Sequence, residues 1–94
     1  MIHLCVMLWP NPGAAAALVE YEDKVLDLLA THGGRVLQRA RTDGANDAPL
    51  EIHVLEFPSQ AALDDYLGDE RRTVFADARE TAIARTEVFS VDLI

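Results

Sequence analysis

The segment from Glu51 to Ser59 reads Glu-Ile-His-Val-Leu-Glu-Phe-Pro-Ser and constrains the fold more than any other. Its apolar residues are branched or aromatic, which is typical of a buried strand. Successive side chains of a strand point to opposite faces. Ile52 and Val54 therefore share one face of this strand, and its other face carries Leu55 and Phe57. A strand that is apolar on both faces is expected to be covered on both faces.

The end of this strand predicts the start of a helix. Pro58 has no N–H for a sheet hydrogen bond, so the strand should stop there. Ser59 is a favourable N-cap for a short helix over about residues 60–67. Asp69 can cap a further helix over about residues 70–83.

The remaining elements follow from hydrophobic periodicity and from the breakers between them. In residues 2–9 the even positions are purely aliphatic and the odd positions are mixed, so the aliphatic face should meet helices. Asn11 before Pro12 resembles an N-cap. The other expected elements are the strand over residues 2–9, a helix from about residue 13 to 31, a strand over residues 35–41 and a last strand over residues 86–93.

The resulting order β-α-β-β-α-β is that of an α+β, ferredoxin-like fold. We expect one antiparallel sheet with the strand order 4-1-3-2 and with the helices on one face only. The two central strands are apolar on both faces, so one face of the sheet would stay uncovered. A second copy of the same sheet is the simplest cover, and two sheets packed face to face give a closed β-barrel dimer with two-fold symmetry.

The composition limits the partners and the location. Ninety-four residues favour a single domain over residues 1–94. The formal net charge of −8 argues against nucleic acid and membrane as partners, because both are bound by clustered Lys and Arg. Cys5 is the only cysteine, which excludes an internal disulfide and fits a reducing cytosol, so we expect a cytoplasmic protein.

Three groups of residues resemble the dimeric α/β-barrel superfamily. They are Tyr21 and Val25 followed by His32-Gly33-Gly34-Arg35-Val36-Leu37; Glu56-Phe57-Pro58-Ser59 followed by Ala61-Ala62 and Tyr66-Leu67; and Arg79 with Ala82. Within the superfamily, the chain is most similar to a family of small bacterial domains of unknown function. The superfamily includes cofactor-free monooxygenases, muconolactone isomerases, haem enzymes and proteins with no known reaction. The resemblance therefore implies a fold and leaves the reaction open.

His3 and His53 are the candidate catalytic residues. They lie on strands that are neighbours in the expected sheet, so both imidazoles could face the barrel interior. Histidine exchanges protons near neutral pH and can bind metal. The alternative is two ordinary core histidines. A metal site would need a further ligand such as Glu51, and we expect neither a metal nor another cofactor.

Glu56 and Cys5 are expected to have structural roles. A carboxylate at the end of an apolar strand needs a partner. For Glu56 we expect a structural ion pair with Arg79, with Arg39 or Arg35 as the alternative partner. Cys5 is expected to be an inert buried thiol, since a reactive thiolate needs nearby positive charge and access.

The barrel is expected to enclose a small, mostly apolar pocket. Its expected lining is His3, Cys5, Met7, Trp9, His53, Leu55 and Phe57. Arg71 and Arg72 are expected on a solvated helix face.

Three functional hypotheses are compatible with such a barrel. The first is a homodimer that binds a small apolar or aromatic molecule. The second is a cofactor-free monooxygenase or isomerase acting on a small aromatic or lactone-like compound. The third is a purely structural dimer with a filled interior. The residues leave open whether the protein is an enzyme.

Overall fold

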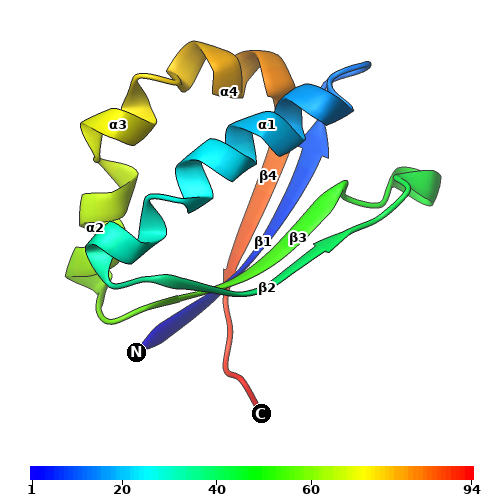
Figure 1. The fold of residues 1–94 in the computed structure, drawn as a ribbon. Helices are drawn as coiled ribbons and strands as arrows, with labels where there is room; N and C mark the ends of the chain where they lie inside the picture. Colours follow the sequence, from blue (N-terminus) through cyan, green and yellow to red (C-terminus); the bar gives the residue numbers. More distant parts are fainter.

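The computed structural model describes residues 1–94 as a four-stranded antiparallel sheet with all helices on one face (Figure 1). The strand order is β2-β3-β1-β4, which is the predicted order 4-1-3-2 read from the other edge, and it confirms the ferredoxin-like arrangement. In chain order the elements are β1 (Ile2–Pro10), α1 (Ala15–Leu26), the 3₁₀ turn η1 (Leu29–His32), β2 (Arg35–Arg41), the 3₁₀ turn η2 (Ala45–Asp47), β3 (Glu51–Phe57), α2 (Gln60–Leu67), α3 (Glu70–Thr73), α4 (Ala76–Ala82) and β4 (Ile83–Ser90).

The register of the sheet sorts the side chains into two faces. Residues directly opposite one another in antiparallel strands share a face. We call the side covered by helices the helix face and the other side the open face. On β1, β3 and β4 the helix face carries Leu4, Val6, Leu8, Glu51, His53, Leu55, Phe57, Thr86 and Val88. The open face carries His3, Cys5, Met7, Trp9, Ile52, Val54, Glu56, Glu87 and Phe89.

The hydrophobic core lies between the helix face and the helices. One cluster contains Leu29, Leu55, Phe57 and Tyr66, with Leu4 and Val6 packed against it. A second cluster contains Leu8, Leu18 and Ala82. Burying a Leu or Phe side chain contributes about 1.5–3 kcal/mol, so these contacts hold the helices on this face. The aliphatic even positions of β1 meet the helices, as their alternation predicted.

The first helix differs from its predicted bounds at both ends. Asn11 does not cap it: the Asn11 amide donates to the carbonyls of Glu80 and Thr81 at 3.0 and 2.9 Å, and so ties the end of β1 to α4. The helix ends at Leu26 rather than near residue 31, because the chain tightens into the η1 turn. Gly33, at φ 72°, then turns the chain into β2.

The predicted single helix over residues 70–83 is wrong. It is divided into α3 and α4 by a turn at Val74 and Phe75, and Val74 is 71% exposed. β-branched and aromatic residues are weak helix formers, and Thr73-Val74-Phe75 is a run of them. Ile83 already has extended backbone and begins β4, which pairs with β1 over Ile83–Ser90 rather than over residues 86–93.

The two helix caps predicted at Ser59 and Asp69 are present. The Ser59 hydroxyl accepts a hydrogen bond from the Ala62 N–H at 3.1 Å, and the Asp69 carboxylate accepts one from the Arg71 N–H at 2.9 Å. Asp69 also bonds His32 at 2.7 Å, which joins the start of α3 to η1. None of the helices is long and apolar enough to span a bilayer.

Candidate functional site

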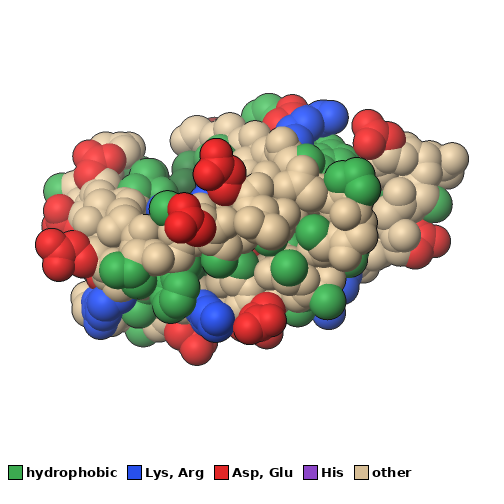
Figure 2. All heavy atoms as spheres, turned by 90° about the horizontal axis from the view of Figure 1, so that it is seen from above, with side chains coloured by type: hydrophobic (Ala, Val, Ile, Leu, Met, Phe, Trp, Pro, Cys, Tyr) green, Lys and Arg blue, Asp and Glu red, His purple; other side chains and the backbone are tan.

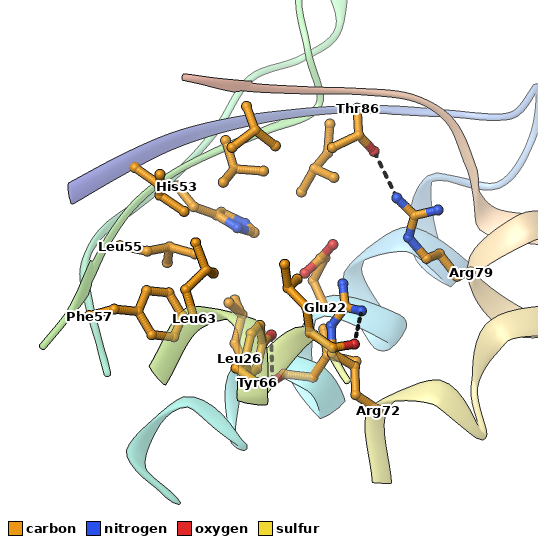
Figure 3. A pocket seen from close by; sticks show the side chains of 16 residues that line it. Glu22, Leu26, His53, Leu55, Phe57, Leu63, Tyr66, Arg72, Arg79 and Thr86 are labelled. Carbon is orange, nitrogen blue, oxygen red and sulfur yellow. Dashed lines mark hydrogen bonds between the residues drawn. The ribbon is translucent and has the colours of Figure 1, made fainter. Parts of the chain in front are cut away.

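A cavity of about 240 Å³ lies between the helix face and the helices (Figure 3). Sixteen residues line it and eleven are hydrophobic. The other five are Glu22, His53, Arg72, Arg79 and Thr86. Leu67, Arg79 and Val88 also belong to the lining and are exposed, so the cavity reaches solvent near α2, α4 and β4.

His53 contributes a neutral imidazole to the wall. Its side chain is 1% exposed, and Nε2 lies 2.7 Å from Glu51 Oε1. Burial lowers the pKa of His53 and outweighs the opposite effect of the Glu51 hydrogen bond. Because the ionised Glu51 can only accept, Nε2 carries the proton and Nδ1 is left as a free base. The only hydrogen bond of the His53 ring is the one between Nε2 and Glu51.

Glu51 fixes the orientation of the His53 ring through this hydrogen bond. Its side chain is fully buried and accepts hydrogen bonds from Arg39 Nε at 2.8 Å and Arg41 Nη2 at 2.7 Å. Burial alone would raise the pKa of Glu51, but the hydrogen bonds from Arg39, His53 and Arg41 outweigh it and lower the pKa to about 2. No group of three or more His, Cys, Asp or Glu side chains is placed to hold a metal ion.

Glu22, on α1, has a raised pKa, in contrast to Glu51. Burial raises the pKa of Glu22 to about 7, and the negative charge of Glu51 adds to this effect. Arg72, Arg39 and Arg79 oppose the shift without cancelling it. Glu22 forms no ion pair, so its carboxyl group carries a proton in about half of the molecules near neutral pH.

Arg72 has a buried N–H that nothing accepts. Its Nε is completely shielded from solvent, and no other side-chain nitrogen or oxygen that is completely shielded lacks a hydrogen-bond partner. Its Nη1 donates a long hydrogen bond of 3.4 Å to the Leu67 carbonyl, and its guanidinium lies 5.3 Å from the centre of the Tyr66 ring. The Tyr66 hydroxyl is held by the Val25 carbonyl at 2.9 Å, and burial raises the pKa of Tyr66 to about 12.

The predicted pocket lining is divided between the two faces of the sheet. His53, Leu55 and Phe57 line the cavity. The other four predicted residues, His3, Cys5, Met7 and Trp9, lie on the open face. His53 stands opposite Val6, an even position of β1, whereas His3 stands opposite Glu56, so the two histidines do not come together.

The predicted ion pair between Glu56 and Arg79 is wrong, because these residues lie on opposite sides of the sheet. On the open face, Glu56 bonds Arg35 Nη2 and His3 Nε2, each at 2.9 Å. The hydrogen bonds from His3 and Arg35 lower the pKa of Glu56. Arg79 lines the cavity and donates a long bond of 3.5 Å to the Thr86 hydroxyl.

Trp9 and Cys5 have no contact with the cavity. The Trp9 indole N–H donates to the Asp47 carbonyl at 2.9 Å, and the Arg85 guanidinium lies 3.9 Å from the Trp9 ring centre. Cys5 is a half-buried free thiol on the open face.

Glu22 and Arg72 were not predicted as site residues from the sequence. Arg72 was expected on a solvated helix face, but it lines the cavity. The signal for Glu22 was present, because it lies four residues after Leu18 and three before Val25, both buried. A carboxylate at a position of the buried stripe is a candidate functional group.

Comparison with known proteins gives matches among solved structures only. No protein-family model matches the chain, and no curated protein matches it. A protein of unknown function from Rhodopseudomonas palustris superposes with a TM-score of 0.81 at 17% identity, covering 99% of this chain and 82% of that one. An uncharacterised NIPSNAP domain protein from Burkholderia xenovorans gives 0.78 at 12%, covering 100% and 95%. An antibiotic biosynthesis monooxygenase gives 0.71 at 16%, covering 100% and 99%.

The chain has a ferredoxin-like fold. This result confirms the fold that the resemblance in the sequence implied. At sequence identities this low, the superpositions show that the folds are alike. A shared fold does not assign a reaction.

Proposed function

We propose that the protein binds a small, mostly apolar molecule in the cavity between the helix face and the helices. The observation that carries this proposal is a cavity of about 240 Å³ with apolar walls and a few polar groups in it. A cavity of ~150 Å³ holds benzene, so this one has room for roughly ten non-hydrogen atoms. This cavity lies beneath the helices of one chain, whereas the pocket predicted from the sequence lay between two paired sheets.

Filling the cavity tests the proposal. Val6→Phe adds an aromatic ring to the cavity wall and should abolish the binding of octan-1-ol and indole, measured by isothermal titration calorimetry. Val74→Phe makes the same change at an exposed site and should bind both probes as the wild type does. If the wild type binds neither probe, the proposal fails.

A second candidate function is proton-transfer catalysis, as in an isomerase or a cofactor-free monooxygenase acting on a small aromatic or lactone-like compound. The observation that favours it is the free Nδ1 of His53, whose ring is oriented by Glu51. Nδ1 could remove a proton from a bound carbon acid, and the ionised Glu51 would stabilise the imidazolium that forms. Protonated Glu22 in the same cavity could return a proton.

Deuterium exchange tests this second candidate. The wild type should catalyse the incorporation of solvent deuterium into an enolisable lactone, followed by NMR. His53→Gln should lose about 10²–10⁴-fold in rate while octan-1-ol still binds. Equal rates for the variant and the wild type would exclude His53 as the base.

We further propose that two copies pair through their open faces. The middle of the open face is apolar and only half-buried in the single chain, with Cys5, Met7, Ile52 and Val54 flanked by Phe89, which is 47% exposed. Association would remove this surface from water. We also propose a cytoplasmic location, for which the single cysteine is the supporting observation.

A further inference from the structure

We infer that the ligand carries a carboxylate, which Arg72 and Arg79 bind beside Glu22 at one side of the cavity. This inference rests on the proposed ligand-binding function and names the class of ligand. The ligand is a small monocarboxylate whose apolar body fills the remaining space.

The pairing of charges singles out these two arginines. The chain has eight Lys and Arg residues and sixteen Asp and Glu residues. Six of the eight basic residues form ion pairs with carboxylates: Lys24, Arg35, Arg39, Arg41, Arg71 and Arg85. The two that do not are Arg72 and Arg79, and both line the cavity. On the surface, basic side chains lie scattered among acidic ones, as Figure 2 shows for one side of the molecule.

The free hydrogen-bonding capacity of these side chains matches a carboxylate. Arg72 Nε is buried without a partner, which costs free energy until an acceptor arrives. Arg79 has a single long bond to Thr86 at 3.5 Å. A planar guanidinium presents parallel N–H donors at the spacing of two carboxylate oxygens. A carboxylate of the ligand would therefore satisfy both arginines.

The cavity is divided into a charged side and an apolar side. Figure 3 shows Glu22, Arg72 and Arg79 on one side, with Leu55 and Phe57 on the other. A ligand with its carboxylate at the arginines would direct its hydrocarbon part towards Leu55 and Phe57. Octanoate, with about ten non-hydrogen atoms, fits the size of the cavity.

Glu22 makes this binding depend on pH. Its protonated form can donate an O–H to the carboxylate of the ligand, whereas its ionised form repels that carboxylate. The charged groups that act on Glu22 are Glu51 on β3, Arg72 on α3, Arg39 on β2 and Arg79 on α4. The pKa of Glu22 is about 7. The affinity for a carboxylate should therefore fall as the pH rises through neutrality.

The test compares octanoate with its neutral counterpart octanamide by isothermal titration calorimetry. At about pH 6.5 the wild type should bind octanoate at least about tenfold more tightly than octanamide, the effect expected from hydrogen bonds between charged groups. Arg79→Gln changes an exposed side chain and should remove most of that preference without affecting the fold. Arg72→Met should do the same, and Lys24→Gln, which removes a positive charge outside the cavity, should not.

The dependence on pH gives an independent measurement. Octanoate binding to the wild type should weaken severalfold between about pH 6.5 and about pH 8.5, while octanamide binding stays constant. Glu22→Gln keeps a hydrogen-bond donor and cannot ionise, so its octanoate binding should stay constant over the same range.

Two outcomes would overturn the inference. If octanoate and octanamide bind equally well, or if the preference persists in both arginine variants, the cavity is an apolar site without carboxylate selectivity. If neither octanoate nor any neutral probe binds, the proposed ligand-binding function fails as well.

Discussion

Two buried glutamates in this protein differ in pKa because their neighbours differ. Glu51 receives hydrogen bonds from two arginines and His53, and its pKa falls to about 2. Glu22 receives none of these bonds, and its pKa rises to about 7. Groups whose environments separate their pKa values in this way are typical of sites where protons move or charges are recognised.

The pKa of Glu22 predicts how the stability changes with pH. Its folded-state pKa of about 7 lies above the ordinary value of 4.5, so the folded chain binds this proton more tightly than the unfolded chain. The contribution of Glu22 to the free energy of unfolding is therefore greatest below about pH 4.5 and is lost as the pH rises to about 7. Glu22→Gln should be more stable than the wild type at about pH 8, by up to about 3 kcal/mol.

Urea unfolding at several pH values measures this difference. The gain from Glu22→Gln should shrink as the pH falls from about 8 towards 4.5, because Glu22 becomes neutral in the folded protein and the cost of its buried charge disappears. Asp64→Asn, at an exposed position on α2, should show no such trend. A constant difference between Glu22→Gln and the wild type would mean that Glu22 ionises normally in the folded protein.

At the scale of elements, the sequence predicted the strands and their order well, but not the register that relates them. The bounds of β2, β3 and α2 follow from local composition and breakers. The pairing of Val6 with His53 does not follow from these local features. A register shifted by one residue would have brought His3 and His53 to the same face. This is why the predicted pocket combined residues from both faces.

Competition between helix formation and strand pairing also explains why one helix was predicted where α3 and α4 are separate. A helical stripe through Val74 and Ala78 fits the periodicity, yet Thr73-Val74-Phe75 disfavours a helix and β4 has to begin at Ile83 to pair with β1. Arg72 could not be assigned to the cavity from a periodicity that assumed one continuous helix. Glu22 could have been, since it lies on the buried stripe of α1.

At the scale of the whole molecule, the uncovered sheet face predicts the state of assembly. The wild type should sediment as a dimer of about twice the 10.3 kDa chain mass. Val54→Glu places a charge in the middle of the open face and should produce a monomer, because a buried, unpaired carboxylate is costly. Sedimentation velocity measures both masses.

Val74→Glu serves as the matched control, because it introduces the same charge at an exposed position between α3 and α4. It should remain a dimer. A wild type that sediments as a monomer at all accessible concentrations would contradict pairing through the open face.

The alternation of side chains along β1 separates two tasks within one strand. Leu4, Val6 and Leu8 belong to the cavity wall, whereas Cys5 and Met7 belong to the surface proposed to meet a second chain. Each subunit would then hold its own ligand, on the outside of the paired sheets and beneath its own helices. Occupancy should saturate at one molecule per chain with a simple hyperbolic curve, and neither subunit should sense whether its neighbour is filled.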